Sequence, residues 1–421
     1  HTGYVKAIIG GRGQKTASLT LNRATDSTRQ PGSTFKIVST YAPALNEKGM
    51  TLATTYEDEP INYSNGAPVN NASGSFNGTT TIRTAIRNSV NTVAVQCFED
   101  VTPELGLKYL DNFGFTTLAH GTESDTDANG NVYTDANLPT ALGGLTYGVT
   151  NIELCASYAT IANGGTYIKP VYYTKILDHN GNVLIENNSA GRSVIKETTA
   201  YLLTSAMEDV VQNGTGTACQ LDNMAVAGKT GTTEDYNDLW FVGYTPYYTC
   251  AVWSGYDGNQ KLPQDARNFH KTLWRKVMNR IHQGMAYKDF DIPAGIEQVA
   301  ICSETGLLPR EGCPVAEEYF DIGTVPTDYC DQHFYEYEEE QEMEIYDKEQ
   351  LTPAPENPGD GTGDGTGGDG TGDGTGDGTG DGTGDGTGDG TGDGTGDGTG
   401  DGTGDGTDGG DIESGDDIYY Y

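Results

Sequence analysis

The sequence predicts an α+β fold in which helices cover a mainly antiparallel sheet. Segments with apolar residues three or four positions apart, typical of helices, fill most of residues 80–115 and recur at Thr150–Gly165. Short alternating or apolar segments follow at 224–233, 238–246 and 248–257, each bounded by turn residues. Helices followed by consecutive strands are typical of an antiparallel sheet with helices packed on it.

The first third of the chain supplies one expected strand and several helices. Residues 4–9 alternate like a strand, and a hairpin partner for it would precede residue 1. The spacing of apolar residues predicts a helix from Ser33 to Gly49, which Pro43 should kink or shorten. Residues 56–80 are polar and are predicted to be loop. Three helical stretches are expected next: 80–89, 90–100 and 103–115.

The middle of the chain leads from a loop into the strands of the sheet. A polar loop is expected at 119–139, and the Thr150–Gly165 helix should end at its Asn-Gly-Gly sequence. Residues 167–186 predict two strands joined by the turn HNGN. A helix is expected from Lys196 to Val211, before the three strands of the sheet.

Charge and composition separate a globular part from an acidic tail. Residues 351–421 hold 18 acidic and no basic residues, and residues 331–350 carry a net charge of −8. Of the total of −37, these segments account for −18 and −8, so −11 remains for residues 1–330. No basic stripe suits nucleic acid. The Gly/Asp/Thr repeats after 351 predict a disordered, low-complexity tail, either a flexible spacer or a weak Ca²⁺ binder.

Ser33 and Lys36, in the stretch RQPGSTFK, form a Ser-x-x-Lys pair at the start of a predicted helix. Residues i and i+3 share a helix face, so the amine can approach the hydroxyl. The helix N-terminus favours a developing oxyanion, and a desolvated lysine can act as a base. A second copy, Ser193–Lys196, is expected to be a helix N-cap only.

Two further motifs follow in order. Lys-Thr-Gly occurs once, in strand-like sequence at Lys229–Thr233, where glycine allows a ligand or another backbone to approach closely. Ser89 and Asn91 form a Ser-x-Asn at the break between two predicted helices. A similar Ser75–Asn77 lies in predicted loop and is not favoured. Together the three motifs are those of penicillin-binding proteins and class A β-lactamases.

The chain resembles the transpeptidase domain of class A, bifunctional penicillin-binding proteins of the Gram-positive type. The resemblance rests on the three motifs and on further segments in the same order. These segments are GYVKAIIGG, NRATDSTRQPGSTFK, GVTNIELCASYATIANGGTYIKP, VVQNGTGTAC, VAGKTGTTEDYNDLWFVGYTP, AVWSGYD, CSETGLLPREGCP and IGTVPTDYCDQH. It implies the serine β-lactamase/penicillin-binding transpeptidase fold, built on a mainly antiparallel sheet covered by helices.

The resemblance implies a serine acyltransferase that needs no cofactor and no metal. Ser33 would be the acylated nucleophile and Lys36 its proton acceptor. Ser89 would relay a proton, Asn91 would hold the substrate amide, and Lys229 would add positive potential.

The remaining implied residues bind substrate: Thr230, Gly231, Thr232 and Thr233 line the site, and Thr230 and Thr232 take the terminal carboxylate. The backbone N–H groups of Ser33 and Thr232 would form the oxyanion hole. The donor would be a D-alanyl-D-alanine stem peptide of peptidoglycan, the acceptor an amine of a neighbouring stem, and β-lactams would acylate the same serine.

Four segments are expected: a transpeptidase domain at 1–290, a small Cys-containing extension at 291–335, an acidic segment at 336–350 and the tail at 351–421. The sequence starts at His1 and has no apolar run of the ~20 residues that cross a bilayer. We therefore expect a soluble, extracytoplasmic fragment of a protein whose membrane anchor and glycosyltransferase domain lie outside it.

The extension contains Cys302, Cys313, Cys330 and His333, which could in principle form a Cys₃His zinc site. Their spacing is not a standard zinc pattern. Because the family implied by the resemblance works outside the membrane, one disulfide among the three cysteines is the favoured expectation. Three others, Cys97, Cys155 and Cys250, are expected to be buried apolar residues.

Alternatives to the transpeptidase are a D,D-carboxypeptidase, a serine β-lactamase and a catalytically inactive wall-binding or sensor module. A β-lactamase needs a group that activates a deacylating water, and Glu153 is the candidate that the sequence offers. It lies in helical sequence that resembles a structural helix of transpeptidases, which favours the transpeptidase.

Overall fold

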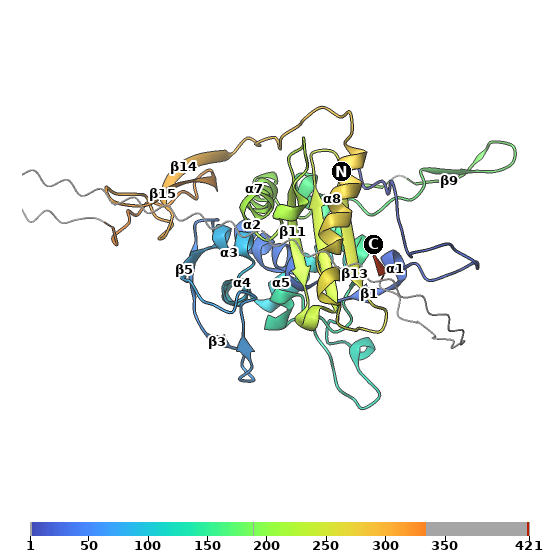
Figure 1. Cartoon of the computed structure of the whole chain (residues 1–421), viewed down its shortest axis with the longest axis horizontal. Helices are drawn as coiled ribbons and strands as arrows, with labels where there is room; N and C mark the ends of the chain where they lie inside the picture. Colours follow the sequence, from blue (N-terminus) through green and yellow to red (C-terminus); the bar gives the residue numbers. More distant parts are fainter. Residues whose placement is uncertain (1, 188, 334–418, 421) are drawn as a thin grey trace, which may run out of the picture. The chain divides into compact units, whose positions relative to one another are not determined.

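The computed structural model describes residues 2–187, 189–333 and 419–420, which belong to one structural unit. Its main sheet is antiparallel, with strand order β11-β12-β13-β16 (Figure 1). The expected acidic segment at 336–350 and almost all of the 351–421 tail lie outside the described residues. Within the described part of the chain, the helices fall short of the length and apolarity that a membrane span requires.

The helices of the described residues are α1 Arg23–Asp26, α2 Ala42–Glu47, α3 Ile82–Asn88, α4 Asn91–Val101, α5 Pro103–Phe113, α6 Asn151–Ala162, α7 Glu197–Asn213 and α8 Phe269–Ile281. The strands are β1 Thr28–Arg29, β2 Thr55–Asp58, β3 Ile61–Asn62, β4 Pro68–Val69, β5 Gly78–Thr81, β6 Val149–Thr150, β7 Thr166–Tyr167, β8 Lys175–Leu177, β9 Val183–Glu186, β10 Arg192–Ser193, β11 Ala227–Thr232, β12 Asp238–Tyr244, β13 Thr249–Gly255, β14 Ile296–Cys302, β15 Val315–Asp321 and β16 Tyr419–Tyr420.

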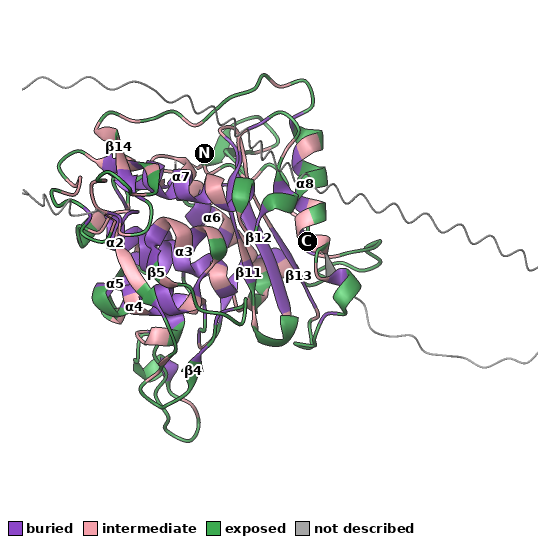
Figure 2. Cartoon of the chain, turned by 60° about the vertical axis from the view of Figure 1, so that its left-hand side comes forward, coloured by how far each residue is buried: buried purple, intermediate pink, exposed green. Residues whose placement is uncertain are grey.

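The two faces of the sheet are covered by different helices. Successive side chains of a strand point to opposite faces, and along β12 Trp240 and Val242 belong to the large core with α6 and α7, whereas Phe241 packs with Trp274 of α8. Figure 2 shows α8 on one side of the strands and α6 and α7 on the other. Every residue of β12 is buried because both faces are covered. The predicted α+β architecture is confirmed, whereas α8 was not predicted.

The helix predicted from Ser33 forms, but with a changing hydrogen-bond pattern. It starts as a 3₁₀ turn at Gly32–Thr34, continues as a π-helix at Ile37–Tyr41 and ends as α2. Pro43 is the second residue of α2, directly after the π-helical turn, and it lacks the backbone N–H that a regular helix would use there. The expected kink is therefore a local change of helix type rather than an end of the helix.

Two predictions of local structure are wrong. Residues 56–80 are not loop alone: β2 pairs with β5, and β3 pairs with β4. β2 and β5 are polar and β3 and β4 have only two residues each, so neither pair shows the apolar alternation of a predictable strand. The strand expected at 4–9 is reduced to one parallel bridge between Tyr4 and Val171, because the described residues supply a hydrogen-bonding neighbour only at its start. The hairpin around HNGN is confirmed as β8 and β9.

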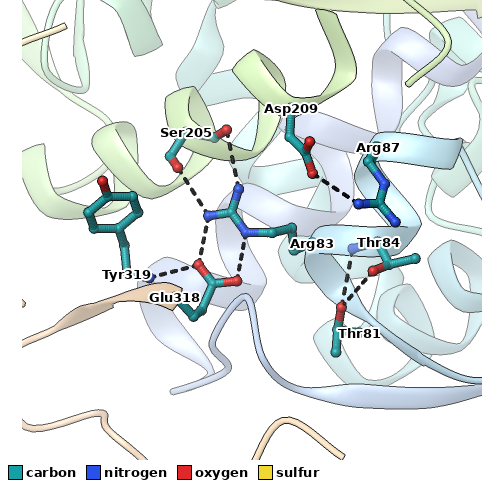
Figure 3. A network of polar contacts seen from close by, with 8 residues as sticks. All are labelled: Thr81, Arg83, Thr84, Arg87, Ser205, Asp209, Glu318 and Tyr319. Carbon is teal, nitrogen blue, oxygen red and sulfur yellow. Dashed lines mark hydrogen bonds and ion pairs between the residues drawn. The ribbon is translucent and has the colours of Figure 1, made fainter. Parts of the chain in front are cut away.

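The β14–β15 hairpin is anchored to the helices through a buried ion pair (Figures 1 and 3). Arg83 of α3 donates from Nε and Nη2 to the two carboxylate oxygens of Glu318 in β15, each at 2.6 Å. Its guanidinium also donates to the backbone oxygen and hydroxyl of Ser205 in α7. A bidentate arginine–carboxylate pair fixes orientation as well as distance, so this hairpin is held against α3 and α7.

Candidate active site

Ser33 lies in the middle of the 3₁₀ turn and is half-buried. Within the described part of the chain its hydroxyl makes no hydrogen bond, so the oxygen is not committed to a structural partner. Lys36 follows three residues later and is completely buried. The sequence-predicted pair therefore lies on one turn of helix, and the buried amine makes its hydrogen bonds to Ser89, Val90 and Asn91 rather than to the Ser33 hydroxyl.

The Lys36 amine is surrounded by oxygen atoms from the turn between α3 and α4. Its Nζ lies 2.8 Å from the Ser89 carbonyl oxygen, 3.2 Å from that of Val90 and 2.6 Å from Asn91 Oδ1. It also lies 3.3 Å from Ser89 Oγ. The structure thus brings the predicted Ser-x-Asn motif onto the predicted Ser-x-x-Lys lysine.

Ser89 is held in an unusual backbone conformation. It closes α3 with φ 59° and ψ 42°, the left-handed region, and its N–H caps the helix by donating to Ala85 and Ile86. A non-glycine residue in this region is strained, and such strain clusters at functional sites. In this turn the Ser89 hydroxyl and the Asn91 side chain both contact the Lys36 amine, whereas sequence periodicity located the turn only as a break between helices.

The Asn91 side chain also fixes this turn. Its Oδ1 accepts from Lys36, and its Nδ2 donates to the Asn70 carbonyl oxygen at 2.6 Å. Its backbone N–H donates to Asn71 Oδ1 at 2.8 Å. An amide offers two N–H donors and two lone pairs, so one donor and one acceptor position of the side chain are left for a substrate.

Lys229 of β11 reaches the same serine from the sheet. Its Nζ donates to Ser89 Oγ at 2.8 Å, and its side chain is fully buried. Burial lowers the pKa of Lys229 to about 7. Burial, together with the charge of Lys229, lowers the pKa of Lys36 well below its usual value. Two amines of depressed basicity therefore flank one hydroxyl, an arrangement suited to moving protons near neutral pH.

Gly231 and Gly32 allow β11 and the Ser33 turn to touch, and Gly143 brings a third segment against the same turn. A Cβ on Gly231 would lie 2.5 Å from the Pro31 carbonyl oxygen, and one on Gly32 would lie 2.8 Å from the Thr232 carbonyl oxygen. A Cβ on Gly143 would lie 2.5 Å from the Gly32 oxygen. Backbones pack this closely only where a side chain is missing. The Lys-Thr-Gly glycine was expected to permit such an approach, whereas Gly143 carried no detectable signal.

The predicted substrate-binding threonines differ in their exposure and in the hydrogen-bond partners of their hydroxyl groups. Thr232 is exposed, and Thr230 is half-buried with its Oγ1 2.7 Å from Oγ1 of Thr215. The hydroxyl of Thr233 instead accepts from the backbone N–H of Asp238 at 2.9 Å, a contact that shapes the turn after β11. Sequence reasoning missed Thr215, although it lies in the quoted segment VVQNGTGTAC.

The second Ser-x-x-Lys at Ser193 and the second Ser-x-Asn at Ser75 do not take part in this site. Ser75 is exposed and lies in the segment between β4 and β5, as the predicted loop implied. Ser193 belongs to β10 and pairs with β7, so its expected role as the N-cap of α7 is wrong. Lys196 occupies the N-cap position, and Asn46 accepts from its backbone N–H at 2.8 Å. A residue distant in sequence has replaced the local cap.

The Glu153 carboxylate is used in hydrogen bonds that stabilise the start of α6. It forms a capping box with Thr150 at the start of α6, and its other carboxylate oxygen accepts from the backbone N–H and hydroxyl of Thr116. Both oxygens of the carboxylate are therefore occupied at the helix N-terminus. This arrangement provides no free base at Glu153 for a deacylating water.

All seven cysteines are free thiols, so the disulfide expected among Cys302, Cys313 and Cys330 is not formed. These three thiols instead lie close to His333, within the extension. Of the cysteines expected to be buried, Cys97 is fully buried and Cys155 and Cys250 are partly exposed.

Comparison with family models gives two matches. The model described as penicillin binding protein transpeptidase domain matches residues 1–279, and that of penicillin-binding protein 1A, C-terminal domain, matches residues 292–335.

Curated relatives and solved structures agree with these models. Penicillin-binding protein 1A of Clostridium tetani is 33% identical over 350 residues, covering 79% of this chain and 43% of its own length. That of Clostridium acetobutylicum is 35% identical over 311 residues, covering 71% and 37%. The chain thus spans about two fifths of the length of these relatives.

Two solved structures show the same fold. Penicillin-binding protein 1A from Haemophilus influenzae superposes with a TM-score of 0.62 and 25% identity over 74% of this chain and 50% of its own. The PonA1 protein from Mycobacterium tuberculosis, solved in complex with penicillin V, gives 0.56 and 25% over 65% and 74%.

Proposed function

Because the chain belongs to the family of penicillin-binding protein transpeptidase domains, we propose that it is a D,D-transpeptidase that crosslinks peptidoglycan stem peptides through an acyl-enzyme on Ser33. The observation that carries this proposal is the convergence of Lys36 and Lys229 on Ser89 Oγ, one helical turn from the uncommitted Ser33 hydroxyl. The donor is a stem peptide ending in D-alanyl-D-alanine, and the acceptor is an amine of a second stem.

In the first step the Ser33 oxygen attacks the carbonyl carbon of the penultimate D-alanine. Lys36 accepts the hydroxyl proton, and its lowered pKa keeps a neutral fraction available for this role. The backbone N–H groups of Ser33 and Thr232 hold the oxyanion, which the close packing of Gly32 on Thr232 supports. The peptide C–N bond then breaks.

The departing D-alanine needs a proton on its nitrogen. Ser89 donates it and regains a proton from the lysines that contact it, of which Lys229 lies 2.8 Å away. Asn91 orients Lys36 and offers its remaining amide positions to the peptide backbone of the substrate. Lys229, Thr230 and Thr232 bind the terminal carboxylate, and Gly231 lets the strand lie against the Ser33 turn. We place Thr233 at the edge of this site, shaping the turn that follows.

In the second step an amine attacks the ester carbonyl, and its proton passes to the departing Ser33 oxygen, which leaves a free Ser33 hydroxyl and a new peptide bond. A D,D-carboxypeptidase or a β-lactamase would use water instead. The engagement of both Glu153 oxygens in capping and in contacts with Thr116 favours the amine. Residues 1–290 are proposed to be this catalytic domain, and 291–335 its extension. Because peptidoglycan is assembled outside the cell membrane, the proposed location is extracytoplasmic.

The test is covalent labelling with benzylpenicillin followed by intact mass and peptide mapping. We expect one adduct per chain, on Ser33, and its loss in Ser33→Ala. Ser193→Ala, which alters the exposed second Ser-x-x-Lys, should label like the wild type. Labelling of folded Ser33→Ala would refute the assignment of the nucleophile.

Two other outcomes separate the rival functions. Folded wild-type protein that forms no adduct would favour an inactive wall-binding or sensor module. Rapid turnover of nitrocefin without a lasting adduct would favour a β-lactamase. Release of D-alanine from a stem peptide with no crosslinked product, in the presence of an acceptor amine, would favour a carboxypeptidase.

A further inference from the structure

We propose that Cys302, Cys313, Cys330 and His333 form a structural zinc site in the C-terminal extension. One ligand atom from each residue, three sulfurs and a ring nitrogen, lies within 4.8 Å of all the others. Cys302 ends β14, Cys313 precedes β15, and the other two lie after β15. The fold therefore collects onto one point four groups that the sequence separates by up to 31 residues.

The distances between the ligand atoms fit a tetrahedral zinc ion. Zn–S bonds of about 2.3 Å and Zn–N bonds of about 2.0 Å place sulfur and nitrogen ligands roughly 3.5 Å apart. His333 Nδ1 lies 3.4 Å from the Cys302 sulfur and 3.2 Å from the Cys330 sulfur. Soft thiolates combined with an imidazole in a four-coordinate site select zinc among common metals.

The outer contacts are those expected around a metal centre. Nε2 of His333, the ring nitrogen away from the sulfurs, lies 2.9 Å from a carboxylate oxygen of Glu304. A carboxylate in this position fixes the ring and directs Nδ1 toward the metal. The backbone N–H of Arg310 donates to the Cys313 sulfur at 3.2 Å, which stabilises a thiolate there.

The backbone around the ligands forms a rigid frame. The N–H of Cys302 donates to Leu307, the N–H of Cys330 donates to Leu308, and Ser303 donates to Pro314. These bonds join the three segments that carry the ligands before any metal is bound. Four protein ligands fill the coordination shell, so the site is a structural one with no open position for a substrate.

The extension has few buried apolar residues of its own, so a metal crosslink would add to the contacts that hold it on α3 and α7. Its buried apolar cluster has only Ile301 and Phe320 from the extension, together with Ala53 from the main domain. Units of about 40 residues rarely fold on a hydrophobic core alone and usually require disulfides or metals. A disulfide would join two of the three sulfurs and leave the third thiol and the oriented histidine without a role.

The experiment measures zinc in the full chain, purified under reducing conditions, supplied with excess zinc chloride and desalted. We expect one zinc per chain in the wild type and none in Cys313→Ser or His333→Ala. Cys155→Ala, in α6, is the matched control and should retain the full zinc content. Cobalt(II) added to the metal-free wild type should give the charge-transfer and d–d absorption of a tetrahedral thiolate site, a readout that does not depend on how the variants fold.

Two results would overturn the proposal. One is wild-type protein that retains no zinc after loading and gives no cobalt–thiolate absorption. The other is a Cys302, Cys313 or Cys330 disulfide, found by non-reducing peptide mapping of protein that had been kept with zinc from lysis onward. Penicillin labelling, measured in parallel, reports on Ser33 separately, so failure of the zinc site and failure of the proposed activity are distinguishable.

Discussion

Removing the Lys229 charge should shift the pH dependence of acylation toward higher pH. Lys229 and Lys36 both contact Ser89 Oγ, at 2.8 and 3.3 Å, so their nitrogens are separated by at most about 6 Å. At an effective dielectric constant of ~20, two charges at that distance repel by about 3 kcal/mol. This repulsion disfavours protonated Lys36, so Lys229→Gln should raise the Lys36 pKa, by up to roughly two pH units.

The sign of the effect follows from the role of Lys36 as a base. Acylation requires neutral Lys36, so its rate rises as pH passes the Lys36 pKa and is lost below it. The shift should be largest below the Lys229 pKa of about 7, where Lys229 carries its charge in the wild type. The maximal rate should also fall, because Lys229 helps to bind the substrate carboxylate.

The assay is the second-order rate of acylation by a fluorescent penicillin as a function of pH, for wild type and Lys229→Gln. Lys196→Gln, an exposed lysine at the start of α7, is the control for a general change of charge and should keep the wild-type midpoint. A lower plateau with an unmoved acid limb in Lys229→Gln would refute the reasoning, since Lys36 would then not be the titrating base beside Lys229.

Three further substitutions test the packing around the site. Gly231→Ala would place a Cβ 2.5 Å from the Pro31 oxygen, and displacement of the strand by about 1 Å should slow penicillin acylation roughly 100-fold; a wild-type rate would show that the contact is not needed. Arg83→Met leaves Glu318, 2% exposed, without its partner and should lower the free energy of unfolding in urea by about 3–5 kcal/mol, whereas Arg83→Met/Glu318→Met should recover most of it. Ser89→Gly should relieve left-handed backbone strain of about 1 kcal/mol and so raise the melting temperature. The same variant lacks the hydroxyl, so penicillin acylation should fall at least ~100-fold. Unchanged acylation would exclude a proton relay through this hydroxyl.

The ion pair between Arg83 and Glu318 links the extension to the active site. α3 carries Arg83 near its first turn and ends at Ser89, so the hairpin that holds Glu318 also restrains the helix that presents the relay hydroxyl (Figure 3). The extension is docked a second time at Gly306, where a Cβ would lie 2.0 Å from the Ala53 oxygen. Loss of the proposed zinc should therefore loosen α3 as well as the extension.

The sequence by itself determined the elements whose signals are local. Apolar periodicity located α4, α5, α6 and α7 and the strands β11, β12 and β13, because each element buries one or both faces. The motifs at Ser33, Ser89 and Lys229 could be distinguished from the similar motifs at Ser75 and Ser193. They follow one another in a set order, and they lie at a helix start, a break between helices and a strand. Helix type was beyond this reasoning, since the π-helical turn before Pro43 depends on how the surrounding helices pack.

Only the tertiary structure decided which groups meet. Lys229 lies 140 residues from Ser89, and the contact between them depends on Gly231 and Gly32 allowing two backbones to touch. The β2–β5 pair was invisible because its strands are polar and distant in sequence, and the β3–β4 pair because each of its strands has only two residues. The cysteine prediction failed for a related reason: the extracytoplasmic setting implied by the resemblance favoured a disulfide, whereas the β14–β15 hairpin brings three sulfurs and a histidine to one point. Long-range contacts of this kind arise from the packing of whole elements, and a local sequence pattern carries no record of them.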